Sequence, residues 1–149
     1  MASPKVCFYP LHSGGMEDAL VIACRLTEKA CGLGHRVHLL ARSESQVKQL
    51  DQLLWQFRPE SFIPHQCLVA GGDDPDPGIR VTLGTAEQVP AEPEVLINLH
   101  PDVWEEHPAF RDIREIVAAD EEERSHGRQR YRFYQDRGYP LQTQQLRGS

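Results

Sequence analysis

The chain opens with two repeats of a short apolar run followed by a longer amphipathic segment. Lys5–Leu11 and Arg36–Ala41 are rich in branched and aromatic residues, as buried strands are. Met16–Leu33 and Ser43–Trp55 place apolar residues at helical spacing, and the second segment opens with an S-x-x-Q capping box. Strands separated by helices favour parallel pairing, because parallel neighbours need a crossover connection. The sequence therefore predicts an α/β fold with a mostly parallel, Rossmann-like sheet flanked by helices.

The rest of the chain predicts further short strands and one long terminal helix. Asp120 is a suitable N-cap, three glutamates follow it, and Gly138 is a suitable stop, so we expect a helix over about 121–137. The 149 residues suffice for one core and show no linker or repeat, so 1–149 is expected to be a single domain. The other expected elements are an extended segment at Ser61–His65, strands at Cys67–Ala70, Ile79–Leu83, Val95–Leu99 and Ile113–Ala118, a loop at Gly71–Gly78 and a short helix at Asp102–Phe110.

A parallel α/β sheet suggests a nucleotide site, but the phosphate-binding glycine pattern is absent. The first strand is followed by His12-Ser-Gly-Gly15 rather than G-x-G-x-x-G, and no G-x-x-x-x-G-K-[ST] occurs. The seven histidines show no H-x-x-x-H or H-E-x-x-H spacing. No serine or cysteine has a nucleophile-elbow context, and no carboxylate pair stands in apolar surroundings. We therefore expect no cofactor, no metal and no catalytic set, and hence no enzyme.

Cations and aromatic rings are concentrated in the terminal helix of an otherwise acidic chain. From Arg124 onward there are six arginines and one acid, whereas the preceding 123 residues carry 10 basic and 21 acidic side chains. At about 100° per residue, five polar or aromatic side chains share one helix face. A hollow beside a glycine, rimmed by guanidinium groups, suits a short ligand with a carboxylate and an apolar side chain. A solvated arginine face with the tyrosines in the core is the competing interpretation. The face comprises Arg124, Arg128, Tyr131, Arg132 and Gln135, with Gly127 and Tyr134 beside it.

A second candidate surface consists of aromatic and apolar residues that follow the end of the second helix. Aromatic residues on loops are typical anchors of protein interfaces, although ordinary core packing is the competing interpretation. The residues are Trp55, Phe57, Phe62, Ile63 and Pro64.

The sequence also predicts where in the cell the protein acts. No stretch reaches the ~18 apolar residues that a membrane span needs, and the start has no signal-peptide core. We therefore expect a cytoplasmic protein that makes no membrane contact. The four cysteines lack C-x-x-C spacing and are expected to be buried, reduced thiols: Cys7, Cys24, Cys31 and Cys67.

The run Arg128–Leu141 resembles the C-terminal signature of the chi subunit of bacterial DNA polymerase III. Four earlier pieces fit the same family in the same order, so the resemblance covers nearly the whole chain. They are Phe8–Leu11, Leu50–Trp55, Ser61–His65 and Val95–Leu99.

This resemblance implies a non-enzymatic replisome adaptor with a nucleotide-binding-like fold that binds no nucleotide. Members of the family link the clamp loader to single-stranded-DNA-binding protein, whose acidic C-terminal tail, ending in proline and phenylalanine, they hold. By position, the resemblance implies a tail site formed by Val117, Arg124, Arg128, Tyr131 and Arg132. The resemblance also places Phe62 at the surface that binds the psi subunit. We extend this surface to the neighbouring aromatic and apolar residues Trp55, Phe57 and Pro64.

Two other functions stay open from the residues alone. A small nucleotide- or cofactor-dependent enzyme would bind its ligand near Ser13–Glu17, at the start of the first helix. Direct binding of single-stranded nucleic acid would use the Arg/Tyr helix for stacking and phosphate contacts. The net charge of −6 argues against sequence-independent binding of duplex DNA, which needs a broad cationic surface.

Overall fold

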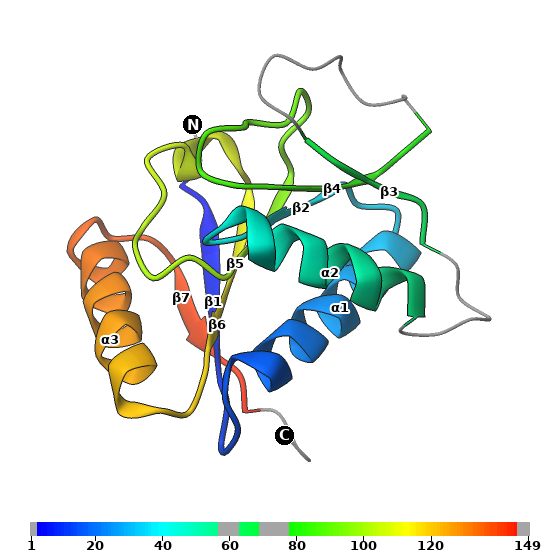
Figure 1. Ribbon diagram of the computed structural model, residues 1–149. Helices are drawn as coiled ribbons and strands as arrows, with labels where there is room; N and C mark the ends of the chain where they lie inside the picture. The colour runs from blue at the N-terminus through cyan, green and yellow to red at the C-terminus, as the bar shows by residue number, and fades with distance from the viewer. Residues whose placement is uncertain (1–2, 57–62, 69–77, 146–149) are drawn as a thin grey trace.

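Seven strands form one sheet in the computed structural model, which describes residues 3–56, 63–68 and 78–145 (Figure 1). Every strand pair is parallel, and the strand order is β3-β4-β2-β5-β6-β1-β7. The predicted parallel α/β sheet is confirmed. The strands are β1 (Lys5–Pro10), β2 (Val37–Leu40), β3 (His65–Cys67), β4 (Val81–Gly84), β5 (Val95–Asn98), β6 (Asp112–Val117) and β7 (Leu141–Thr143).

Helices cover both faces of this sheet (Figure 1). The helices α1 (Met16–Gly32) and α2 (Glu44–Gln56) lie on one face, and α3 (Glu121–Asp136) lies on the other. Successive side chains of a strand point to opposite faces, so the strands contribute to two apolar cores. Ile116 belongs to the core under α1 and α2, and Phe8 to the core under α3. No helix among the described residues is long and apolar enough to cross a membrane.

The predicted helix ends are present. The backbone N–H of Gln46 donates to the hydroxyl of Ser43 (3.2 Å), while the Gln46 side chain accepts from the backbone N–H one residue before that cap (2.9 Å). The carboxylate of Asp120 accepts from the backbone N–H of Glu123 (3.3 Å) and caps α3. At the other end Gly138 has a φ of +74°, which glycine adopts without strain. Local sequence therefore sets where α2 and α3 begin and where α3 ends.

Three elements differ from the sequence prediction. The helix expected over Asp102–Phe110 is only a 3-10 turn, His107–Ala109, because a proline in the turn removes a backbone donor. The strand expected at Cys67–Ala70 instead starts at His65 and ends at Cys67, where it pairs with β4; the last two residues of the predicted range lie outside the described part. The strand β7 was not predicted, because it carries a single apolar residue and forms only by pairing with the distant β1.

The expectation of buried thiols holds for two of the four cysteines. All four are free; Cys7 and Cys24 are buried, whereas Cys31 and Cys67 are half-buried. Burial raises the pKa of the Cys24 thiol to about 12, so this side chain stays protonated and acts as an apolar core residue.

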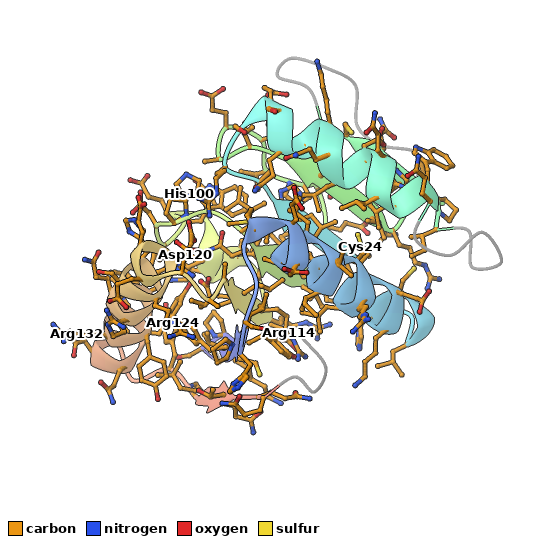
Figure 2. The ribbon with its side chains drawn as sticks, turned by 60° about the horizontal axis from the view of Figure 1, so that its bottom comes forward. Cys24, His100, Arg114, Asp120, Arg124 and Arg132 are labelled. Carbon is orange, nitrogen blue, oxygen red and sulfur yellow. The ribbon has the colours of Figure 1, made fainter. Side chains whose placement is uncertain are left out.

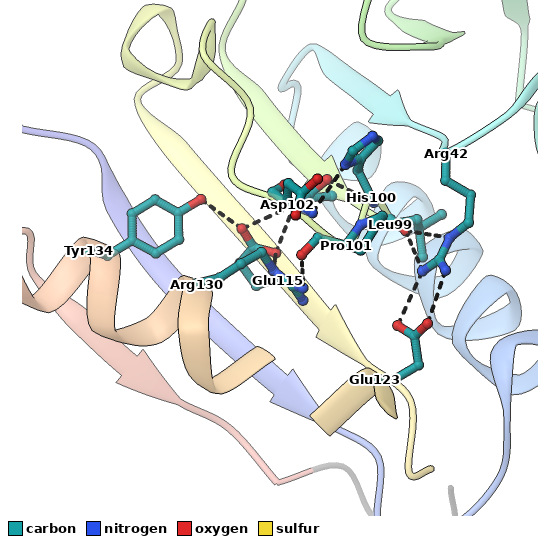
Figure 3. Close-up of polar contacts among 10 residues, drawn as sticks. Arg42, Leu99, His100, Pro101, Asp102, Glu115, Glu123, Arg130 and Tyr134 are labelled. Carbon is teal, nitrogen blue, oxygen red and sulfur yellow. Dashed lines mark hydrogen bonds and ion pairs between the residues drawn. The ribbon is translucent and has the colours of Figure 1, made fainter. Parts of the chain in front are cut away.

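A buried carboxylate joins α3 to the sheet (Figure 3). Glu115 of β6 is 0% exposed and receives the Nε–H of Arg130 (2.9 Å) and the hydroxyl of Tyr134 (2.7 Å), both from α3. The side-chain amide of Asn98, at the end of β5, donates to the same carboxylate (2.9 Å). Arg130, 3% exposed, also donates to the carbonyl of Pro101 (2.7 Å). Burial and the Glu115 charge raise the pKa of Tyr134, so its hydroxyl remains a donor. These directional contacts fix the rotation of α3 about its axis.

A second ion pair holds the first turn of α3. Arg42, just after β2, donates to both carboxylate oxygens of Glu123 at 2.9 and 3.1 Å, and its guanidinium also donates to the carbonyl of Leu99 (2.9 Å) (Figure 3). A forked arginine–carboxylate pair fixes geometry as well as distance. The start of α3 is thereby tied to the carboxyl ends of two strands.

Arg130→Met should destabilise the protein by about 3–5 kcal/mol, because the Glu115 carboxylate would stay buried without its cation. Arg132→Met removes the same charge from an exposed position of the same helix and should change stability by less than about 0.5 kcal/mol. Urea unfolding followed by circular dichroism measures both. Equal losses for the two variants would contradict the role given to the buried pair.

The imidazole of His38 is buried in its neutral form. Its ring is 1% exposed and stacks on Trp104 (5.6 Å between centroids) and Phe110 (6.2 Å). Its Nδ1 lies 2.8 Å from the hydroxyl of Thr82, and its Nε2 has no hydrogen-bond partner among the described residues. Burial lowers the pKa of His38 from 6.5 to about 3.

The folded state should therefore lose stability as the pH falls from about 6.5 toward 3, since the unfolded chain binds a proton at His38 that the folded chain excludes. His38→Phe keeps a ring in the stack and removes the titrating group. The variant should show a shallower dependence of unfolding free energy on pH between about 4 and 6.5. An unchanged slope in parallel urea titrations would show that His38 does not exclude the proton.

Candidate peptide-binding site

A cavity of about 330 Å³ lies between α3, the carboxyl end of β1 and the strand β7; we call it the α3 cavity. The helix contributes four of its residues, and strands β1, β6 and β7 and the segments after β1 and β7 contribute the rest. None of the lining residues is acidic, although the chain carries a net charge of −6. The lining consists of Phe8, Pro10, Leu11, His12, Val117, Arg124, Gly127, Arg128, Tyr131, Thr143 and Gln145.

Gly127 lets the helix approach the sheet at this point. A Cβ on Gly127 would lie 2.9 and 3.0 Å from the two methyl groups of Val117, closer than side-chain carbons approach in proteins. The glycine is therefore required for the close contact of α3 with β6. Val117 and Gly127 both line the cavity.

Two aromatic rings form the apolar wall. The rings of Phe8 and Tyr131 meet edge to face with 5.2 Å between their centroids, and Phe8 is buried. Tyr134, expected beside Tyr131 at the hollow, instead points into the core, where its hydroxyl reaches Glu115. That expectation was wrong because Tyr134 lies on the buried side of α3, with Arg130.

Two guanidinium groups stand at the cavity. Arg128 is exposed and donates to the carboxylate of Glu121 (2.7 Å), which is itself 79% exposed. The side chain of Arg124 has no hydrogen bond or ion pair with any described residue. Figure 2 shows Arg124 on the inner side of α3 and Arg132 on its outer side, and Arg132 does not line the cavity. The cavity thus offers two cations to an anionic ligand.

The structure therefore brings together four of the five residues expected at this site: Val117, Arg124, Arg128 and Tyr131. Sequence reasoning missed the residues contributed by β1, by the segment after it and by β7. The only signal for them was the aromatic run Phe8–Leu11, whose place beside α3 depends on the strand order.

The second candidate surface is only partly described. Trp55, in the last turn of α2, is 49% exposed, and its ring centroid lies 4.6 Å from that of His65. Pro64 is exposed beside that histidine. Phe57 and Phe62 lie outside the described residues. Ile63, the fifth residue of this surface, is buried in the core under α1 and α2, so for this residue the core interpretation holds. Of the described residues, only Trp55 and Pro64 are open to solvent.

The start of α1 does not resemble a phosphate site. Gly15 is the N-cap and offers no side-chain contact, and Gly14 has a φ of +96°. The Asp18 carboxylate reaches over Gly14, with Oδ2 within 2.2 Å of the position of a Cβ there. A fixed negative charge thus lies where a phosphate would approach the helix. Within the described part of the chain, no three His, Cys, Asp or Glu side chains gather as a metal site.

The sheet and the cavity define an α/β domain of the nucleotide-binding type that presents an acid-free cavity rather than a phosphate-binding loop. Its fold is shared with the crystal structure of T4 UvsW, with a TM-score of 0.67 at 8% identity over 95% of this chain and 41% of that chain. At that identity the likeness concerns the fold alone.

Sequence relatives are more specific. The model of the family described as DNA polymerase III chi subunit, HolC, matches residues 3–142. The DNA polymerase III subunit chi of Pseudomonas aeruginosa is 37% identical over 142 residues, which is 95% of this chain and 96% of the relative. The corresponding subunit of Escherichia coli K12 is 26% identical over 141 residues, 91% of this chain and 94% of the relative.

The chain belongs to the DNA polymerase III chi subunit family. It is accordingly a non-catalytic accessory subunit of the clamp loader in the polymerase holoenzyme, and the resemblance inferred from the sequence motifs is confirmed.

Gly127→Ala should lower stability by on the order of 1 kcal/mol, because the strain against Val117 exceeds the gain in helix propensity. In a Val117→Ala background, Gly127→Ala should leave the stability of the protein unchanged or raise it, because the clashing methyl groups are absent. Thermal unfolding of the two single variants and the double variant gives the coupling free energy between positions 117 and 127. If Gly127→Ala alone stabilises the chain, the close contact is not what selects the glycine.

Proposed function

We propose that the chain is a replisome adaptor whose α3 cavity binds the acidic C-terminal tail of single-stranded-DNA-binding protein and whose Trp55 surface binds the psi subunit. The observation that carries the proposal is the absence of any acidic residue from a cavity lined by two arginines and two aromatic rings. Nucleic acid would be reached through the tail-bearing protein. The adaptor would act in the cytoplasm, where replication takes place.

The two cations suit the carboxylates of such a tail. Arg124 is free to bind an incoming carboxylate, as far as the described residues go, and Arg128 would exchange its bond to Glu121 for one to the ligand. Exposed ion pairs contribute about 0–1 kcal/mol, so breaking the Glu121 pair costs little. The pair keeps Arg128 near the cavity without closing the site.

The apolar wall suits the terminal ring of the tail. The space between Val117, Gly127 and Tyr131 lies above the buried Phe8, and a further ring there would make edge or offset contacts worth about 0.5–1.5 kcal/mol beyond the area buried. A terminal phenylalanine places its ring and its α-carboxylate within a few ångströms of each other. The cavity likewise offers guanidinium groups for the carboxylate and an apolar wall for the ring.

The psi surface would use the aromatic residues at the end of α2. Trp55 and Pro64 are exposed, and the proposal includes Phe57 and Phe62, which lie outside the described residues. Large exposed aromatic side chains are typical centres of binding energy in protein interfaces. This surface and the α3 cavity belong to different helices, so both partners could bind at once.

The tail site is tested by titrating the chain with a hexapeptide of acidic residues ending in Pro-Phe, and with the same peptide lacking the phenylalanine. Arg128→Ala should weaken binding roughly three- to fivefold, about 0.7–1 kcal/mol, the upper range for an exposed ion pair, whereas Arg132→Ala should remove only long-range attraction and weaken binding less than about twofold. Glu121→Gln should tighten binding about two- to threefold, because Arg128 is released. Isothermal titration at low and at high salt measures each.

Equal effects of the two arginine substitutions, or binding that does not need the phenylalanine, would contradict the proposed site. Tight binding of a thymidine oligonucleotide without the tail would instead favour direct nucleic-acid binding by α3.

A further inference from the structure

A second cavity, of about 320 Å³, lies on the opposite face of the sheet, between α1 and the strands β1, β5 and β6. We call it the α1 cavity. Its charged lining includes Arg25 and Lys29 of α1 and Arg114 of β6, and its apolar lining includes Leu26 and Leu33. Nothing in the proposed tail or psi sites uses these residues.

The α1 cavity is cationic. Arg114 is held in place by the carboxylate of Asp112 (2.8 Å) and by a hydrogen bond to the hydroxyl of Tyr9. Arg25 and Lys29 are exposed and have no hydrogen bond or ion pair with any described residue. Three permanent cations thus face a single acid, Asp112, in a chain whose net charge is −6.

The imidazole that also lines this cavity does not alter its charge balance against an anion. The Nδ1 of His35 lies 2.6 Å from the carboxylate of Glu94, and Glu94 does not itself line the cavity. Leu33, which also lines the cavity, is 69% exposed. The cavity therefore combines unneutralised cations with an exposed apolar rim.

The two cavities meet at the end of β7. Thr143 and Gln145 line the α3 cavity, and Gln144, between them, lines the α1 cavity. This alternation follows from an extended backbone, which the bond from the Gln144 N–H to the Phe8 carbonyl (2.9 Å) holds in place. β7 is the outer strand of the sheet, so no further strand separates the two faces there. In Figure 2, Arg114 lies on the side of the sheet that carries α1, and Arg124 lies on α3.

We infer that the α1 cavity is a second docking site for the acidic residues that precede the anchored end of the same tail, which passes around the end of β7. The inference rests on the proposed tail function. An acidic peptide fits better than a neutral segment because Arg25 and Lys29 have no ion-pair partner among the described residues, and because neighbouring residues of one segment, Thr143 to Gln145, line the two cavities. Binding at two points raises affinity through the effective concentration of the second segment.

The test uses two peptides: the acidic hexapeptide ending in Pro-Phe, and the same peptide extended at its amino end by ten residues of alternating Asp and Gly. Ten residues add a reach of up to roughly 33 Å. On the wild-type chain at low salt, the long peptide should bind at least about fivefold more tightly than the short one. The variant Arg25→Gln/Lys29→Gln should lose this gain and keep the short peptide's affinity.

A matched control is Lys48→Gln/Arg137→Gln, which removes two exposed cations that do not line the α1 cavity and should keep the gain. A nitroxide on the amino end of the long peptide gives a second readout, since it should broaden amide resonances of Arg25 to Leu33 in the wild-type chain but not in the α1 variant.

The outcomes separate the two proposals. If the short peptide fails to bind, the tail site itself is wrong. If the short peptide binds but the long one binds no tighter, or if both double variants lose the gain equally, the tail site stands and the α1 docking site is overturned.

Discussion

The buried carboxylate of Glu115 has the largest influence on how this fold presents its surfaces. Donors from α3 and β5 converge on it, and a buried charge of this kind is stable only while its partners keep their geometry. Because Arg130 and Tyr134 are fixed inward, Gly127 and Tyr131 must face the end of β1. The helix therefore has one rotational setting, and the α3 cavity exists only in that setting.

The arginines of α3 differ in burial and in their ion-pair partners. Arg130 is buried and bound to Glu115, and Arg128 is exposed and bound to the exposed Glu121. Arg124 has no ion pair with any described residue. Arg132 faces outward, away from the cavity. No acidic residue lines the cavity, although Glu121 pairs with Arg128 at its rim, so the cavity is cationic because of Arg124 and Arg128.

Periodicity and capping residues sufficed to predict the parallel sheet, the limits of α3 and the approach of Arg124, Arg128 and Tyr131 to one another. They did not predict that Tyr134 points into the core. Helical periodicity does not show which of two neighbouring tyrosines will bind a buried carboxylate of another element, here Glu115 of β6. They also missed β7 and the residues of β1 in the cavity, since these depend on pairing between segments more than 130 residues apart. Long-range partners leave no local signal in a single sequence.

The position of β1 has a consequence for how the molecule is made. It is the first strand to leave the ribosome, but both of its neighbours, β6 and β7, come from residues 112–143. Such distant pairing closes large loops and slows folding. Both edges of β1 therefore stay without their partner strands until residues 112–143 have been synthesised, and an unpaired apolar strand of this kind is prone to aggregate in the nascent chain.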